Sequence, residues 1–527
     1  MSMKDLQSAL VKGMIGRREF MAGAMALGAT ASTASLFAAQ AAETPQKGGQ
    51  LKVGFQQGST TDSLDPATFN NDFMFAIGYA VFNGLTEITP DGKAAGELAE
   101  SYEATPDAKV WTFRLRSDVV FSDGSKLTSA DVIATLNHHM SEQSKSGIKP
   151  LLAQISAMKA QGDHTVVFEL ESGNADFPFV FNDYHLGIRK AVDGKIDPLS
   201  PIGTGGYTIE AFEPGVRALL KRRDGYWKEG RAHIDEVEIL AIADAAARLN
   251  SLMTGEVDLI DRPDLKTIHL LKRRPGINIH TQNGTLHYTL PMHTDTAPFD
   301  DVNVRMALKY SIDREELVEK VLQGYGAVGN DQPISSSVPY FNAELEQRSY
   351  DPDKAKFHLK QAGLSSLDVT LHTADAAFGG AVDASLLFSE SAKAAGINVK
   401  VHREPNDGYW SNVWLQKSFS ASYWGGRPTP DLMFSAAYAA GADWNETRWK
   451  NPRFNELLVS ARAELDQGKR AEMYGEMQSI CSNEGGAIIP MFGQYVSAMS
   501  DKVKKPAAVT EMWDLDSQRF IERWWVA

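Results

Sequence analysis

Short runs of alternating apolar and polar residues recur along the chain and predict half-buried β-strands. The runs VWTFRLR at 110–116, HTVVFEL at 164–170 and INVKV at 397–401 place hydrophobic side chains at about every second position. This is the period of a strand with one buried face. Segments with a helical period lie between these runs, so the alternation predicts an α/β protein with mixed sheets.

Two of the helical segments carry recognisable start signals. Thr128 stands three residues before Asp131, a spacing typical of a capping box at a helix N-terminus. Asn451 followed by Pro452 is a second start signal, because proline fits the first turn of a helix. The apolar stripe expected after it consists of Phe454, Leu457, Leu458, Ala461 and Leu465.

The length and the pattern together predict several lobes rather than one domain. The chain has 527 residues, of which 43% are hydrophobic, and domains usually contain roughly 100–200 residues. No fixed-period repeat, heptad pattern or long low-complexity linker interrupts the sequence. We therefore expect lobes that pack directly against each other, with the chain crossing between them.

The N-terminal segment 1–41 has the features of a cleavable export signal of the twin-arginine type. GRREFM at 16–21 precedes a mildly apolar run at 22–37 and an Ala39-Gln40-Ala41 cleavage pattern. The run is too weakly apolar to span ~30 Å of hydrocarbon stably. We expect a mature protein beginning at Ala42, soluble in the periplasm of a Gram-negative host, with no cysteine near the cleavage site to carry a lipid anchor.

Charge and motif content argue against several functional classes. The formal net charge of -14 disfavours binding to nucleic acid or anionic lipid. No G-x-S-x-G, H-E-x-x-H or calcium-loop motif is present, and the twelve histidines form no cluster along the sequence. His138 and His139 are adjacent and point to opposite sides of a helix. We expect no enzyme activity, no metal site and no cofactor, and a buried, unreactive Cys481.

A set of ordered segments resembles a known family. The stretch ELAESYEATPDAKVWTFRLRSDVVFSDGSKLTSADV at 97–132 is similar to the hallmark region of the family 5 extracellular solute-binding proteins of ABC importers, the oligopeptide, dipeptide and nickel-binding group. Further matching segments follow the same order: TDSLDPA (61–67), PIGTGGYTIEAFEPG (201–215), RRDGYW (222–227), LMTGEVDLI (252–260), PFDDVNVRMALKYSIDREELV (298–318) and YWGGRPTPD (423–431).

The resemblance implies a two-lobed periplasmic binding protein, or Venus-flytrap, fold with an enlarged first lobe. On this basis lobe I contains residues 42–288 and 496–527, and lobe II contains residues 289–495. The lobes close about a hinge on a solute in the cleft between them. The implied partners are a peptide or other small solute and the membrane permease of an ABC importer, whose ATPase is a separate chain. We expect a monomer.

The segment Tyr423-Trp424-Gly425-Gly426-Arg427 is the most informative about the solute. Peptide-binding relatives carry an aspartate just after this Trp-x-Gly, where it pairs with the α-ammonium group of the ligand. Arg427 reverses that charge, and a guanidinium matches carboxylate or phosphate oxygens. We hypothesise that Arg427 binds an acidic group of the solute beside Trp424. Alternatively, Arg427 pairs with Asp431 or another acidic residue and only holds the loop. Asp431 is itself a candidate site residue, as one that orients Arg427.

Other cleft candidates follow from their places in the resembling segments. Asp65 follows the first predicted strand, Tyr409 and Trp410 lie in a loop of lobe II, and Trp444 comes shortly after Arg427. Each of these has packing as its alternative role. A short peptide, an opine-like acidic conjugate and a metal chelate all remain open as solutes. The competing functions are a nickel or metal-chelate receptor and a periplasmic chaperone or hydrolase.

Overall fold

The computed structural model describes residues 45–406 and 408–527, so the predicted export signal at 1–41 lies outside the described residues. Its largest sheet has nine strands, in the order β10, β11, β12, β1, β13, β19, β14 and β18, with β15 paired to β19. The bounds of these strands are β1 Gln50–Phe55, β10 Tyr207–Glu213, β11 Arg217–Arg222, β12 Glu236–Ala241, β13 Leu259–Asp261, β14 Ile277–Pro291, β15 Gly326–Val328, β18 Ser422–Trp424 and β19 Ala487–Ser500.

This sheet is mixed, as the alternating pattern predicts. β1 runs parallel to β12 and β13, whereas β19 runs antiparallel to β13, β14 and β15. Leu51, Val53 and Phe55 of β1 are completely buried, because helices such as α4 (Asp72–Val81) and α8 (Ala245–Thr254) pack around this central strand. The prediction of an α/β protein with mixed sheets is confirmed.

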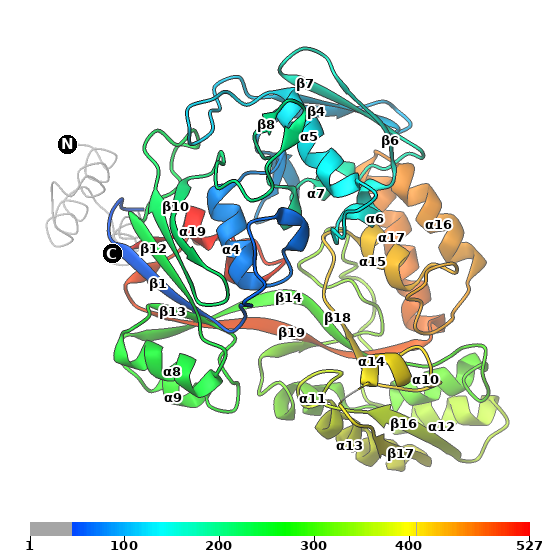
Figure 1. Ribbon diagram of the computed structural model, residues 1–527. Helices are drawn as coiled ribbons and strands as arrows, with labels where there is room; N and C mark the ends of the chain where they lie inside the picture. The colour runs from blue at the N-terminus through cyan, green and yellow to red at the C-terminus, as the bar shows by residue number, and fades with distance from the viewer. Residues whose placement is uncertain (1–44, 407) are drawn as a thin grey trace, which may run out of the picture.

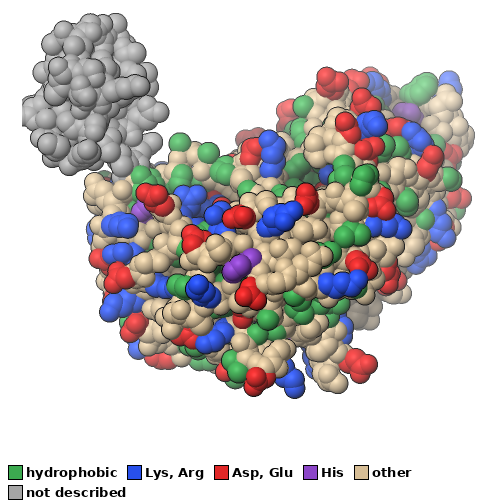
Figure 2. Space-filling view, turned by 90° about the horizontal axis from the view of Figure 1, so that it is seen from above, with side chains coloured by type: hydrophobic (Ala, Val, Ile, Leu, Met, Phe, Trp, Pro, Cys, Tyr) green, Lys and Arg blue, Asp and Glu red, His purple; other side chains and the backbone are tan. Residues whose placement is uncertain are grey.

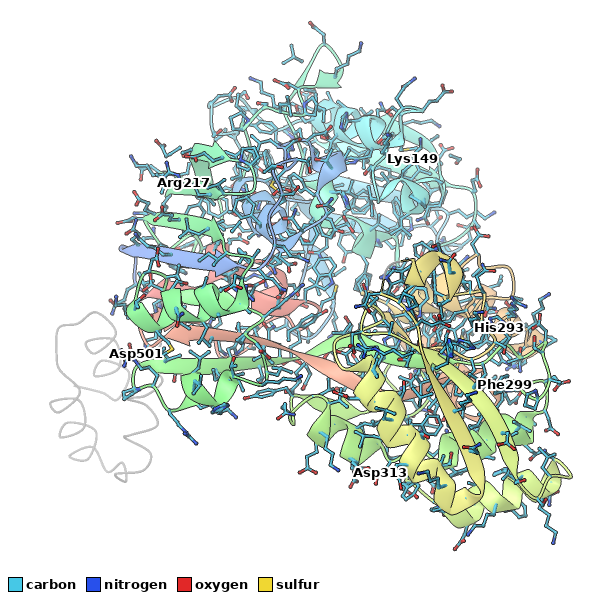
Figure 3. All side chains as sticks on the ribbon, turned by 60° about the horizontal axis from the view of Figure 1, so that its bottom comes forward. Lys149, Arg217, His293, Phe299, Asp313 and Asp501 are labelled. Carbon is cyan, nitrogen blue, oxygen red and sulfur yellow. The ribbon has the colours of Figure 1, made fainter. Side chains whose placement is uncertain are left out.

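Two long antiparallel strands, β14 and β19, run from one half of the molecule to the other (Figure 1). Met499 near the end of β19 belongs to the core around β1, whereas Ile488 near its start belongs to the core around β16 (Leu367–Thr373). His293, just after β14, and Asp501, just after β19, accordingly lie at opposite ends of the pair (Figure 3). The lobe boundaries that we predict, at 288 and 496, fall inside these two strands.

The first half contains a second sheet, of four antiparallel strands. Its order is β4 (Ala99–Ala104), β5 (Val110–Leu115), β7 (Thr165–Leu170) and β6 (Ile155–Ala160). α5 (Ser129–Met140) covers this sheet and begins as predicted, because the Thr128 backbone N–H and hydroxyl both donate to the Asp131 carboxylate, at 2.7 and 2.9 Å. The strands expected at 110–116 and 164–170 are therefore present.

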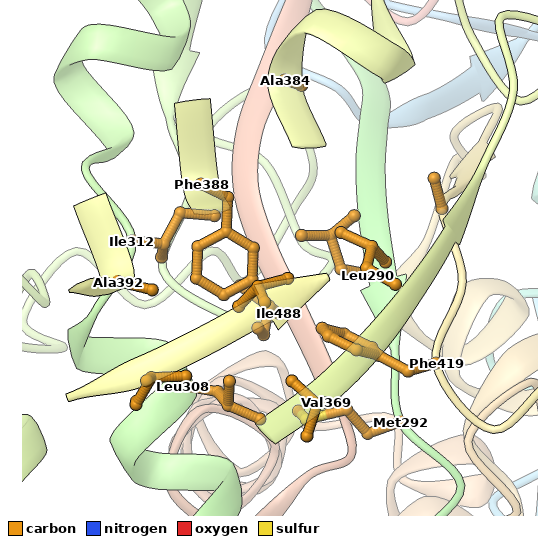
Figure 4. Close-up of a cluster of buried hydrophobic side chains, with 14 of the residues drawn as sticks. Leu290, Met292, Leu308, Ile312, Val369, Ala384, Phe388, Ala392, Phe419 and Ile488 are labelled. Carbon is orange, nitrogen blue, oxygen red and sulfur yellow. The ribbon is translucent and has the colours of Figure 1, made fainter. Parts of the chain in front are cut away.

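The second half is built around the parallel pair β16 and β17 (Ile397–Arg403), which confirms the strand predicted at 397–401. In its core, Phe388 packs with Phe419 and Ile488, so helix, loop and long strand are joined (Figure 4). The surrounding helices are α10 Val302–Tyr310, α11 Arg314–Lys320, α12 Pro352–Gln361 and α13 Ala381–Ala392.

Three further helices, α15 (Pro430–Ala437), α16 (Pro452–Ala463) and α17 (Gln467–Glu484), lie beside α7 (Phe177–Val180) of the first half (Figure 1). The Asn451 side chain accepts from the Phe454 N–H at 2.9 Å and caps α16 as expected. The predicted apolar stripe is buried up to Ala461. The inclusion of Leu465 is wrong, because α16 ends at Ala463 and Leu465 is 37% exposed.

Cys481 of α17 is buried, as predicted, and burial raises the pKa of its thiol. Among the described residues, no helix combines the length and the apolar character needed to cross a bilayer. The shorter elements are η1 Pro66–Thr68, β2 Thr86–Ile88, β3 Ala94–Gly96, α6 Lys149–Leu152, η2 Tyr184–Leu186, β8 Ala191–Val192, β9 Lys195–Ile196, α9 Ile268–Lys272, η3 Lys393–Ala395, α14 Tyr409–Asn412, β20 Val503–Lys504, α18 Asp514–Ser517, α19 Phe520–Arg523 and β21 Trp525–Val526.

Candidate functional site

A cavity of about 550 Å³ lies where the two halves meet along β14 and β19. Its walls combine residues of the first half with β18 and the loop after it. The first half contributes Asp72, Phe75, Tyr184, Arg262, Trp513 and Asp514, β18 and the following loop contribute Tyr423, Gly425, Gly426 and Arg427, and the long strands contribute Leu286 and residues 494–496. Elements from distant parts of the sequence thus form one cleft.

A smaller aromatic pocket of about 230 Å³ adjoins this cleft. The two cavities share Tyr423, Gly425 and Arg427. Ring centroids of neighbouring aromatic residues lie 5.6–6.4 Å apart, which shows that the rings pack against each other as one continuous wall. The aromatic residues of this wall are Trp410, Trp414, Tyr423, Trp424 and Trp444.

β18 positions the centre of the aromatic wall by pairing with β14. Trp424 lies opposite His287, and Tyr423 lies opposite Tyr288. Because successive strand residues face opposite ways, Trp424 is only 6% exposed whereas Tyr423 is 44% exposed. The loop that follows then approaches β14 so closely that a Cβ at Gly426 would lie 1.7 Å from the Thr285 side chain.

The guanidinium of Arg427 is available to an anion. Its Nη1 donates to the carbonyls of Gly425 and Gly426 at 3.1 and 3.2 Å. Among the residues that the structure describes, no carboxylate lies within 4.0 Å of it. Burial lowers the pKa of Arg427, and Tyr184 and Asp183 across the cleft act in the opposite direction.

Asp431 lies elsewhere and has a different partner. Its carboxylate accepts from Nε of Arg462 at 3.0 and 3.1 Å, and its side chain is 4% exposed. Burial raises the pKa of Asp431 to about 6. The pairing of Arg427 with Asp431, which the sequence left open, is therefore absent from the structure, and Asp431 helps to join α15 to α16.

A buried carboxylate lies behind the aromatic wall. Glu446 is 3% exposed, and its Oε2 accepts from Nε1 of Trp414 at 2.8 Å while its Oε1 accepts from the hydroxyl of Thr289 at 2.8 Å. Burial raises the pKa of Glu446. Glu446 thus fixes the orientation of one ring of the pocket and ties it to β14.

An acidic cluster lies on the side of the cleft formed by the first half. Asp72, Asp261 and Asp514 bring carboxylate oxygens within 4.8 Å of one another. Arg262 lies beside them, with Nη2 2.5 Å from Asp72 and Nε 3.6 Å from Asp514. Burial, reinforced by Asp514, raises the pKa of Asp72 to about 8 and that of Asp261 to about 7. At neutral pH the carboxyl group of Asp72 therefore keeps its proton, and Arg262 supplies a positive charge beside the cluster.

The sequence-predicted candidates fall into two groups. Arg427, Tyr423, Trp424 and Trp444 line the two cavities, and so does the weaker candidate Trp410. Tyr409 and Asp65 contribute to packing and to local hydrogen bonds. The Tyr409 hydroxyl donates to the Ala421 carbonyl at 2.8 Å, and the Asp65 carboxylate is 2.9 Å from Nε2 of His138.

Several site residues were missed by the sequence analysis. Trp414 lies four residues after Trp410, a helical spacing that signals a shared face. Arg262, Asp72 and Asp514 come from three separated segments, and no local pattern connects them. Charged side chains of both signs are interspersed over the face seen in Figure 2.

Comparisons with known proteins agree with this geometry. The model for "Bacterial extracellular solute-binding proteins, family 5 Middle" matches residues 93–446. The chain is 26% identical over 480 residues to the dipeptide-binding protein of Escherichia coli, covering 82% of this chain and 85% of that protein. It is 25% identical over 469 residues to the glutathione-binding protein GsiB of Pectobacterium atrosepticum, covering 85% of this chain and 89% of that protein.

A solved structure shows the same fold. HbpA2 from Haemophilus parasuis aligns with a TM-score of 0.80 at 21% identity, covering 91% of this chain and all of that chain. The two-lobed fold inferred from the resemblance is confirmed, together with its mixed sheets. Because the family model spans well over half of the sequence, the chain belongs to the family 5 extracellular solute-binding proteins of bacterial ABC importers.

Proposed function

We propose that this protein binds an acidic, peptide-like solute in the cleft and delivers it to the membrane permease of an ABC importer. The proposal includes export to the periplasm under the direction of residues 1–41, a monomeric mature protein, and an ATPase on a separate chain. It also includes the lobe division described above, with residues 42–288 and 496–527 in lobe I and 289–495 in lobe II. Binding, not catalysis, is the role that the relatives' names support.

The choice of an acidic solute rests on the position and surroundings of the Arg427 guanidinium. It borders both cavities, and the described residues place no carboxylate within 4.0 Å of it. A guanidinium in a partly desolvated cleft is stabilised by a carboxylate in a two-pronged geometry. Glutathione, named in one relative, is a tripeptide with two carboxylates, which is consistent with an acidic peptide-like solute.

The aromatic wall adds a second element of specificity. Flat indole rings supply apolar contact area at low conformational entropy cost, so they favour a flat or apolar group on the solute. The pocket volume of about 230 Å³ suits one side group, while the adjoining cleft of about 550 Å³ suits the main body.

Closure follows from the fact that the cleft is lined by both halves. A solute that contacts Arg427 on one side and Tyr184 or Trp513 on the other binds the closed form more tightly than the open form. The permease then recognises the closed, loaded form. A solute touching one half alone would bind without shifting the equilibrium.

Calorimetry with untagged protein tests the proposal. The panel contains neutral and acidic di- and tripeptides, opine-like conjugates and metal chelates, because all three classes were left open. We expect saturable binding of an acidic member. Arg427→Ala should weaken it by at least roughly 30-fold, since truncating one partner of a desolvated charge pair costs about 2–5 kcal/mol.

Arg453→Ala is the matched control. Arg453 lies on α16, is half exposed and pairs with Glu476, away from both cavities. It should bind like the unmodified protein. Undiminished binding by Arg427→Ala would refute the role of Arg427, and turnover of a panel member would refute the proposal that the protein only binds.

A further inference from the structure

Two histidines that are thirty residues apart in the sequence come together on the outer parallel sheet of the second half. β16 and β17 pair in parallel register, and His372 lies directly opposite His402. Side chains at paired positions of neighbouring strands project from the same face of a sheet. Their ring centroids are indeed 5.1 Å apart.

Glu404 joins this pair because it follows His402 by two residues, the strand period. Its Oε1 is 2.6 Å from Nδ1 of His372 and 3.6 Å from Nε2 of His402. One donor atom from each of the three residues lies within 4.8 Å of the other two. In a tetrahedral zinc site with bonds of about 2.0–2.1 Å, ligand atoms are about 3.3 Å apart. Small side-chain rotations therefore bring the three donors to bonding distance.

The three residues are also accessible and suitably charged. The side chain of His402 is 54% exposed, and those of His372 and Glu404 are 20% and 15% exposed. The Glu404 carboxylate supplies a negative charge between the two imidazoles. The basic groups nearby, Arg403 and Lys417, face elsewhere or act at longer range: Arg403 pairs with Asp375 at 3.7 Å.

We propose that His372, His402 and Glu404 form a surface binding site for a divalent transition metal of the zinc, nickel or copper type. Two imidazoles and one carboxylate suit these metals, whereas magnesium and calcium prefer an all-oxygen set. Water fills the remaining coordination positions, so the site is open on one side. None of the three residues lines the solute cleft, and the site does not depend on the proposed function.

The position of the cluster connects it to the aromatic pocket. The His372 carbonyl accepts from the Ala421 N–H at 2.9 Å and from the Tyr409 hydroxyl at 3.3 Å. Ala421 directly precedes β18, which carries Trp424, and Tyr409 directly precedes Trp410. A cation held by His372 and His402 thus braces the ends of β16 and β17, to which the segments that carry Trp424 and Trp410 are hydrogen-bonded.

Zinc titration of the untagged protein at pH 7.5 tests the site, with zinc chloride as the probe and magnesium chloride as the negative control. We expect one equivalent of zinc and no response to magnesium. His402→Ala should weaken zinc binding by roughly 100-fold or more, since even second-shell changes at metal sites cost 10–100-fold. His269→Ala, which removes an exposed histidine of the first half, is the matched control and should leave binding unchanged.

A second variant, Glu404→Gln, keeps the size of the side chain and removes its charge, and should weaken zinc binding by roughly tenfold or more. Thermal unfolding of His402→Ala without metal should match that of the unmodified protein, because the His402 side chain is 54% exposed. X-ray absorption of the zinc complex should show two imidazole ligands. An unmodified protein that takes up no zinc overturns the proposal. So does equal weakening in His402→Ala and His269→Ala, which would indicate adventitious binding to surface histidines.

Discussion

A buried ion pair between the two halves of the molecule gives a quantitative prediction about the separation of α17 from α7. Asp176 precedes α7 in the proposed lobe I, and Nη2 of Arg470 on α17 lies 2.7 Å from its carboxylate. The two side chains are 2% and 3% exposed. Arg470 is held on its own side by the Ala461 carbonyl and the Tyr340 hydroxyl, at 3.2 and 3.0 Å.

The perturbation is Asp176→Asn, which keeps the shape and removes the charge. In the structure Arg470 would then be buried without its counter-ion, whereas in a state with α17 separated from α7 water would solvate it. A buried pair that loses one partner costs about 3–5 kcal/mol, and the asparagine carbonyl recovers part of this as a hydrogen bond to a charged donor. We expect a net cost of about 2 kcal/mol, or roughly a 30-fold shift toward opening.

Hydrogen exchange at Ala175 measures this shift. Its N–H donates across the same contact to the Arg462 carbonyl at 2.8 Å, so it exchanges when α16 and α17 separate from α7. Asp176→Asn should accelerate this exchange by roughly 30-fold. Asp353→Asn, which alters an exposed pair with Lys356, should have no effect. An Ala175 exchange rate in Asp176→Asn within about threefold of the unmodified protein would refute the reasoning.

Two further predictions concern the cleft. Gly426→Ala places a methyl group into the Thr285 side chain, so the loop must move. We expect the free energy of unfolding to fall by about 1–3 kcal/mol and solute binding to weaken. Gly425 has open space around it, so Gly425→Ala should leave the free energy of unfolding in urea titrations unchanged. The pKa of Asp72 is about 8 in the folded protein and 3.8 in the unfolded chain. The folded state therefore binds the extra proton between these values, and stability falls as the pH rises through this window. Asp72→Asn should flatten that fall in urea titrations at pH 5, 7 and 9, and an unchanged slope would contradict the assignment.

The parts of the molecule that were predictable from the sequence are those set by neighbouring residues. The capping of α5 by Thr128 and Asp131 and the strand β5 depend on local spacing, and both are as expected. Arg427 and Trp424 were identified because one short motif contains them. Local interactions of this kind leave a signature that a single sequence displays.

The contacts that the sequence did not predict depend on which distant segments the fold brings together. Asp431 pairs with Arg462, thirty-one residues later, whereas the sequence analysis left open its pairing with the nearer Arg427. His372 and His402 form no cluster along the chain, and only the parallel register of β16 and β17 makes them neighbours. The hydrophobic pattern restricts the register of two paired strands, but which strands pair is decided by the packing of distant segments, and a local residue pattern does not specify that.

The long strands β14 and β19 restrict how the two halves can move. Their pairing is continuous at both ends and irregular only between Asn283 and His287 and at Tyr288–Leu290. A two-stranded ribbon twists and bends out of its plane far more readily than it shears, because shear breaks the ladder of hydrogen bonds. We expect the opening movement to be a rotation with essentially one degree of freedom. The connection between the halves then offers no flexible segment to a protease, and the same binding surfaces meet again each time the cleft closes.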